Sequence, residues 1–195
     1  MLASDIEQSI EDIFNLYTKY GSADYIGEPV SQLEHMCQAA MLAEKETGDP
    51  ELILAAFFHD IGHLFEFIFP VENMEGVGVC DHEKLAFDYL KEKGFSERIC
   101  KLVKSHVDTK RFLTYRYPAY YEKLSEASKT TLKHQGGVMS ASEATAFESD
   151  PLFSEYIKLR EWDDRAKEMN IEIPALAHYK KIAIEHLTQN TSHGK

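Results

Sequence analysis

Apolar residues recur at intervals of three and four along most of the chain, which is the pattern of helices with one buried face. Ile6, Ile10 and Ile13 begin the first such series, and the capping sequence Ser4-x-x-Glu7 just ahead of it predicts where that helix starts. No stretch shows a convincing alternation of apolar and polar residues. The pattern therefore predicts helices and no sheet.

Two further helix starts are marked by capping residues. Ser31-x-x-Glu34 predicts a helix that runs to about Thr47. Asp49-Pro50 predicts the next one, with the aspartate as the cap and the proline at the first helical position. This third helix runs to about His63 and is rich in Ala, Leu and Phe, so we expect it to be buried on all sides.

Glycine and proline separate the remaining elements. We predict a loop over residues 66–80 and helices at 82–93, 96–107, 118–133, 140–148, 151–169 and 175–188. The sequence is thus predicted to form an all-α, single-domain helical bundle over residues 1–195, with an ordered core over about 4–188 and a flexible tail at 190–195.

Composition narrows the class of partner. The net charge is −12, with 33 acidic against 21 basic residues, which argues against nucleic acid and against an anionic membrane surface. The three cysteines form no Cys-x-x-Cys pair, and the longest apolar run has seven residues, Leu52 to Phe58, where a membrane span needs about 20. Without a signal-peptide pattern, the predicted location is the cytoplasm. A small anionic substrate remains compatible with the charge, in a monomer or a small homo-oligomer.

Histidine and aspartate side chains stand at the ends of several apolar helices. A lone helical histidine is usually a core or surface residue, but bundle helices can bring several such side chains to one point. Imidazole and carboxylate suit Fe, Mn or Zn, and the lack of cysteine ligands argues against a structural zinc site. Sequence alone leaves Asp163 and its neighbour Asp164 as alternatives. The candidate ligands are His35, His59, Asp60, His82, His106 and Asp163.

This ordered set resembles the HD-domain superfamily, many of whose members are metal-dependent phosphohydrolases. The flanking sequence resembles one branch of it, the mixed-valent diiron oxygenases of phosphonate catabolism. The segments that carry this resemblance are Asp24-Tyr25-Ile26-Gly27-Glu28, Gln32-Leu33-Glu34-His35, His59-Asp60-Ile61-Gly62-His63, Gly94-Phe95-Ser96-Glu97-Arg98 and Gln135-Gly136-Gly137.

The resemblance implies two iron ions, Fe(II) and Fe(III), with O2 as co-substrate. One ion would be held by His35, His59, Asp60 and Asp163, and the other by Asp60 as a bridge together with His82 and His106.

The resemblance also implies roles around the metals. Tyr25 would shield the second iron, and Glu28 would read the ammonium group of the substrate. The residues that match phosphonate contacts are His63, Lys110, Ser128 and Arg160.

The implied reaction is the oxidative cleavage of the C–P bond of a 1-hydroxy-2-(amino or trimethylamino)ethylphosphonate, which yields inorganic phosphate and glycine or glycine betaine. Val77 and Cys80 stand where this branch often has aromatic residues, which would leave room for a bulkier head group. The alternative is a metal-dependent phosphohydrolase acting on a phosphomonoester or nucleotide. A non-catalytic sensor would have a broken ligand set, whereas all six positions are intact.

Overall fold

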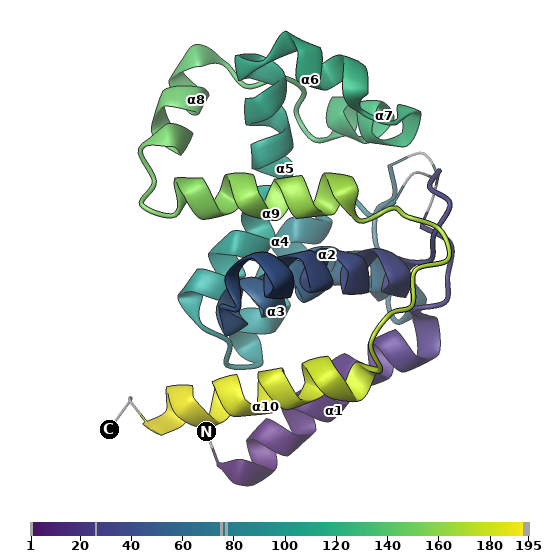
Figure 1. Ribbon diagram of the computed structural model, residues 1–195, viewed down its shortest axis with the longest axis vertical. Coiled ribbons are helices and arrows are strands. Elements are labelled where there is room, and N and C mark those ends of the chain that lie inside the picture. Colours follow the sequence, from purple (N-terminus) through teal and green to yellow (C-terminus); the bar gives the residue numbers. More distant parts are fainter. Residues whose placement is uncertain (1, 26, 75, 77, 193–195) are drawn as a thin grey trace.

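The computed structural model describes residues 2–25, 27–74, 76 and 78–192, and it confirms the all-α prediction (Figure 1). Within those ranges the only β-structure is two isolated bridges, Asp24 with Ser31 and Asn73 with Val79. The helices are α1 (Ala3–Tyr20), α2 (Gln32–Thr47), α3 (Pro50–Phe58), the 3-10 helix η1 (Ile61–Phe67), α4 (His82–Glu92), α5 (Glu97–Arg116), α6 (Pro118–Lys123), α7 (Glu126–His134), α8 (Ala141–Glu148), α9 (Phe153–Arg165) and α10 (Leu176–Ser192).

The short helix α3 lies at the centre of the bundle. Every residue from Leu52 to Phe58 is buried, because α2, α5, α9 and α10 all pack against this helix. The Phe57 ring stacks between Tyr17 of α1 and Tyr179 of α10, with centroids 4.5 and 4.4 Å away. The Tyr17 hydroxyl also donates to the Phe57 carbonyl oxygen at 2.9 Å. Aromatic packing of this kind fixes the end of α3, where the predicted ligands stand.

The other helices form two groups around this centre. Helices α1 and α10 pack against each other at one end of the molecule, and α9 runs alongside α2 in the middle (Figure 1). Helices α6, α7 and α8 gather around the C-terminal half of α5. A small second apolar cluster, Phe112, Leu113, Met139 and Ala144, lies there. The long helix α5 therefore joins the main core to this outer group.

Two predicted helix starts are confirmed in detail. The Ser31 hydroxyl accepts from the Glu34 amide, while the Glu34 carboxylate accepts from the Ser31 amide at 2.7 Å. Asp49 caps α3 by accepting from the amides of Glu51 and Leu52. The predicted capping box at Ser4 is wrong: Ser4 lies inside α1, and the Asp5 carboxylate accepts from the Leu2 amide ahead of the helix.

Four of the predicted elements also have wrong boundaries. Helix α3 ends at Phe58, and a 3-10 helix follows it where the prediction had a continuous helix and then a loop. The single helix predicted at 118–133 is two helices, because the Ser125 hydroxyl accepts from the Ser128 amide and starts α7. Helix α5 continues to Arg116 instead of ending near residue 107. The last helix reaches Ser192, into the predicted tail, and 193–195 lie outside the described residues.

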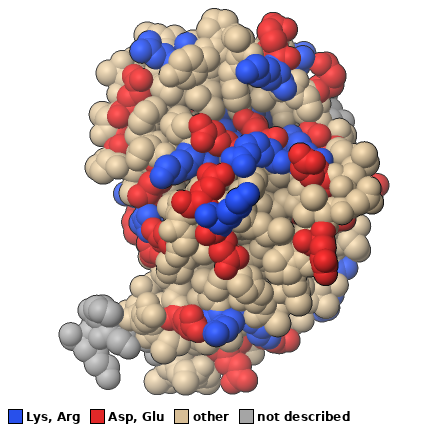
Figure 2. All heavy atoms as spheres, in the orientation of Figure 1, with Lys and Arg blue, Asp and Glu red and all other residues tan. Residues whose placement is uncertain are grey.

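Charged side chains of both signs are mixed on the face shown in Figure 2, where basic and acidic residues stand next to one another over the middle of the molecule. Among the described helices, none combines the length and the apolar character needed to cross a bilayer.

Arg98 joins three helices through its guanidinium, and we expect its loss to destabilise the fold. From α5 it donates to Asp49 and Glu51 of the α3 start and to Glu155 of α9, at 2.8 to 2.9 Å. We predict that Arg98→Met lowers the free energy of unfolding by about 1–2 kcal/mol, measured by urea denaturation. Lys101→Met, which removes an exposed cation of the same helix, should stay within about 0.5 kcal/mol of wild type. Equal effects of the two substitutions would contradict this role.

Candidate metal centre

Four buried histidines meet in two pairs at the centre of the bundle. His35 comes from α2, His59 follows α3, His82 begins α4 and His106 lies in α5. The Nε2 atoms of His35 and His59 are 3.0 Å apart, and those of His82 and His106 are 2.9 Å apart. These rings are 3% exposed or less, so water cannot separate the facing nitrogens.

The other ring nitrogen of each histidine contacts a backbone carbonyl. Nδ1 of His35 lies 2.9 Å from the Ala166 oxygen, and Nδ1 of His59 lies 2.8 Å from the Ala56 oxygen. Nδ1 of His82 and of His106 lie 3.2 and 2.7 Å from the carbonyl oxygens three residues before them. Because a carbonyl oxygen only accepts, Nδ1 carries the proton in all four neutral rings.

This tautomer leaves two unprotonated Nε2 atoms facing each other in each pair. Two lone pairs at 3 Å repel unless a cation lies beside them. Two ligands at about 2.1 Å from one ion, at right angles, are themselves about 3 Å apart, which matches both pairs. Metal-bound histidines typically donate their second N–H to a carbonyl in this way. The residues present therefore fit a metal ion at each pair.

Asp60 lies between the pairs and faces both. One oxygen, Oδ2, is 3.5 and 3.4 Å from Nε2 of His35 and His59. The other, Oδ1, is 3.4 and 3.3 Å from Nε2 of His82 and His106. Burial alone would raise the pKa of Asp60, but the surrounding histidines outweigh it and hold the pKa well below its usual range. An ionised carboxylate with one oxygen toward each pair can bridge two ions.

Asp163 adds a second carboxylate on one side only. From α9, its Oδ1 is 3.4 Å from His35 Nε2 and 3.8 Å from His59 Nε2. Its neighbour Asp164 points instead to Tyr120 and Arg160. The structure thus places Asp163, and not Asp164, at the histidine pair. The first candidate site is His35, His59, Asp60 and Asp163, and the second is Asp60, His82 and His106.

Two glycines allow the second site to form. A Cβ at Gly62 would lie 2.1 Å from the His82 carbonyl oxygen, so only glycine lets η1 approach the start of α4 this closely. A Cβ at Gly78, where φ is +122°, would lie 2.7 Å from Cε1 of His63. Asp81, directly before His82, has φ +51°. The backbone is thus unusual on both sides of His82.

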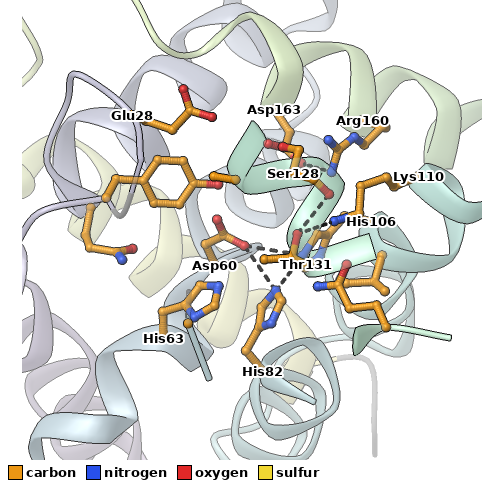
Figure 3. A pocket seen from close by; sticks show the side chains of 16 residues that line it. Glu28, Asp60, His63, His82, His106, Lys110, Ser128, Thr131, Arg160 and Asp163 are labelled. Atoms are coloured by element: carbon orange, nitrogen blue, oxygen red, sulfur yellow. Dashed lines mark hydrogen bonds and ion pairs between the residues drawn. The ribbon is translucent and has the colours of Figure 1, made fainter. Parts of the chain in front are cut away.

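A cavity of about 60 Å³ opens beside the second site (Figure 3). All six predicted phosphonate and shielding residues line it: Tyr25, Glu28, His63, Lys110, Ser128 and Arg160. Val77 lies outside the described residues, and Cys80 is partly exposed in the turn before α4.

His63 differs from the four facing histidines in its proton. Its Nδ1 accepts from the Val79 amide at 3.1 Å, so Nε2 carries the hydrogen in the neutral ring. Burial and the neighbouring His82, on which the ring stacks with centroids 3.9 Å apart, lower the pKa of His63 well below its usual value. Although its ring lies close enough to Asp60 and His82 to complete a ligand group, this tautomer offers a hydrogen-bond donor instead.

Lys110 brings a cation to the cavity wall. Its ammonium donates to Thr131 of α7 at 2.8 Å, and the side chain is only 4% exposed. Burial, and then the positive charge of Arg160, lower the pKa of Lys110 to about 7. Asp108, two residues earlier on α5, pairs with Arg111 and not with Lys110.

Tyr25 and Glu28 close another side of the cavity. The Tyr25 ring stacks on His35, with centroids 4.1 Å apart. Burial, followed by the nearby carboxylates of Asp60 and Asp163, raises the pKa of Tyr25 well above its usual value. The Glu28 Oε1 atom accepts from the Ser125 hydroxyl and from the Lys167 ammonium, both at 2.7 Å. Glu28 is therefore held by the residue that caps α7 and by the segment after α9.

Comparison with known proteins agrees with this geometry. The HD domain family model matches residues 32–172, more than half of the chain. The chain is 37% identical over 170 residues to [1-hydroxy-2-(trimethylamino)ethyl]phosphonate dioxygenase (glycine-betaine-forming) of Leisingera caerulea, covering 87% of this chain and 86% of that one. It is 33% identical over 172 residues to hydroxymethylphosphonate dioxygenase of Gimesia maris, covering 88% and 85%.

The chain belongs to the HD-domain family of phosphonate dioxygenases. It is also 47% identical over 187 residues to an uncharacterized protein of Acanthamoeba polyphaga mimivirus, covering 96% of this chain and 85% of that one.

Some residues around the site of this HD domain were missed from the sequence. Thr131 of the cavity wall stands in a polar helix and gave no signal, whereas Gln135 stood in a recognised segment but was assigned no role. Tyr120 and Lys167 contact site residues that lie 40 and 139 positions away in the sequence, so no local pattern could identify them. Gly62 did stand in a recognised segment, but its closeness to His82 depends on the fold.

Gly62 offers a direct test of the second site in this HD domain. We predict that Gly62→Ala displaces His82 and weakens metal binding at the second site at least about tenfold. Loading with Fe²⁺ under anaerobic conditions, followed by gel filtration, should then leave about one ion per chain where wild type retains about two.

The matched control is Gly48→Ala. Its Cβ would meet nothing within 4 Å, although φ is +64°, so it should cost about 1 kcal/mol of stability and leave the metal content unchanged. A Gly62→Ala protein that keeps two ions would contradict the account.

Proposed function

We propose that this protein is an oxygenase that uses two iron ions and O2 to cleave the C–P bond of a 1-hydroxyalkylphosphonate and release inorganic phosphate. The observation that carries the proposal is the shared carboxylate: Asp60 turns one oxygen to each of two histidine pairs, beside a cavity lined by cations and donors. When bound, the iron pair would supply the oxidising power of the reaction.

The residues around the cavity suit a phosphonate. Lys110 offers a buried ammonium, the neutral His63 offers an N–H, and Ser128 offers a hydroxyl. Charge-assisted hydrogen bonds from such groups are stronger than neutral ones, and burial strengthens them further. The substrate phosphonate would thus be held beside the second site, with its C1 hydroxyl toward Asp60.

Glu28 and Tyr25 would act on the other end of the substrate. We propose that the substituent on C1 is an aminomethyl or trimethylaminomethyl group, so that the carbon product is glycine or glycine betaine. Glu28 lines the cavity and carries the negative charge that would face such a cation. Tyr25, which stacks on His35 and lines the cavity, would cover the second site until substrate displaces the phenol.

The direct test is phosphate release by the iron-loaded protein. Three substrates separate the head groups: 2-amino-1-hydroxyethylphosphonate, its N-trimethyl analogue and hydroxymethylphosphonate. We expect phosphate only when both iron and O2 are present, with one of the two cationic compounds fastest. Release of phosphate from a phosphomonoester without O2, and from none of the phosphonates, would instead identify a phosphohydrolase.

Lys110 gives this proposal a pH dependence. Because its pKa is lowered to about 7, the ammonium that would bind phosphonate is present below that pH and lost above it. We predict that kcat/KM of wild type falls as the pH rises through about 7. In Lys110→Arg, whose guanidinium stays charged, this falling limb should be reduced. Identical falling limbs in the two proteins would rule out Lys110 as the titrating group.

Removing the charge separates binding from folding. Lys110→Met should raise KM about 10- to 100-fold, the value of one charge-assisted hydrogen bond. The metal-free variant should unfold at the same temperature as wild type or higher, because a buried cation is costly to the fold. A large loss of thermal stability would show that Lys110 serves the fold instead.

A further inference from the structure

A closed ring of polar contacts stands behind Asp163, on the side away from the histidines. The Tyr120 hydroxyl donates to Asp164 Oδ2 at 2.7 Å and accepts from Arg160 Nε at 2.9 Å. The Arg160 Nη2 group donates to the other oxygen of Asp164. Tyr120 of α6 and Asp164 of α9 therefore hold the Arg160 guanidinium in place.

That guanidinium in turn sets the direction of Asp163. Arg160 Nη1 donates to Asp163 Oδ2 at 2.8 Å, while Asp163 Oδ1 faces His35 Nε2 at 3.4 Å (Figure 3). A free carboxylate can rotate about its Cβ–Cγ bond. With one oxygen bound to Arg160, only the other is left for the first site. Arg160 is thus engaged with the protein through three of its nitrogens, although it also lines the cavity.

Tyr120 is the contact by which α6 reaches this network. None of the six described residues of α6 is fully buried, so the helix is not held by a core of its own. Arg160 and Asp163 are 4% and 2% exposed. Loss of the hydroxyl would leave the buried Nε of Arg160 without its acceptor, and this unsatisfied donor favours reorientation of the guanidinium.

We infer that Tyr120, through Arg160, is a positioning residue for the first metal site and acts on that site alone. Among the described ligands of the second site, the shared carboxylate Asp60 faces the histidine pairs, and His82 and His106 are oriented by backbone carbonyls, whereas Arg160 donates to Asp163 of the first site. The inference rests on the metal centre of the proposed function and not on the reaction.

The test is a titration of the metal-free protein with Co²⁺, which takes the same imidazole and carboxylate ligands and is followed by its visible absorption. His35→Ala and His106→Ala, each removing one class of site, assign the two affinities. Tyr120→Phe should lower the Co²⁺ affinity about tenfold at the class of site that is lost in His35→Ala. It should leave the other class within about twofold of wild type.

Two further variants make the result specific. Asp164→Asn, which loosens the same guanidinium, should weaken the same class. Tyr117→Phe, which removes an exposed hydroxyl from the residue just before α6, should change neither. Unchanged affinities in Tyr120→Phe, or equal loss at both classes, would overturn the inference. Wild-type protein that binds no Co²⁺ would overturn the metal centre and the inference together, whereas failure of phosphate release alone would leave the inference standing.

Discussion

The carboxylate of Asp60 is buried at the centre of the bundle, where its charge has to be compensated. Removing a carboxylate from water costs several kcal/mol unless charges or hydrogen bonds compensate for it. Here the facing Nε2 atoms of the four histidines carry no proton, so the compensation would come from the ions that they hold, with one oxygen of Asp60 directed to each pair. The buried helix α3 ends just before Asp60, and its aromatic contacts with Tyr17 and Tyr179 hold that end in place.

The side chains around Asp60 are each oriented by a contact with a further group. The histidines are oriented by backbone carbonyls, so their direction depends on helix positions and not on other side chains. Asp163 is oriented by Arg160, which Asp164 and Tyr120 hold in turn. Lys110 places a buried ammonium at the cavity wall. Burial of this charge is unfavourable for the fold, as its lowered pKa shows, but the charge is available to bind an anion. The apolar core of the helices stabilises the fold, and the polar residues at the centre would bind metal ions and substrate.

Much of this arrangement could be predicted from the sequence. The sequence placed Asp60 at the end of an apolar helix, among histidines that a helical bundle can bring to one point, and Ser31 and Asp49 marked two helix starts correctly. Local patterns failed where competing signals lay close together. Ser4 and Asp5 both could cap α1, and Ser125 interrupts what reads as a continuous helix. Contacts between distant residues, such as Tyr120 with Arg160, could not be predicted, because they depend on how α6 and α9 pack.

If Asp60 bridges two ions, one ion lies on each side of its carboxylate. Anomalous diffraction at the iron edge, from crystals loaded with iron under anaerobic conditions, would locate them. We predict two peaks about 3.5–4 Å apart, one beside His35, His59 and Asp163 and the other beside His82 and His106, with Asp60 between them. A single peak, or iron bound away from Asp60, would contradict the account.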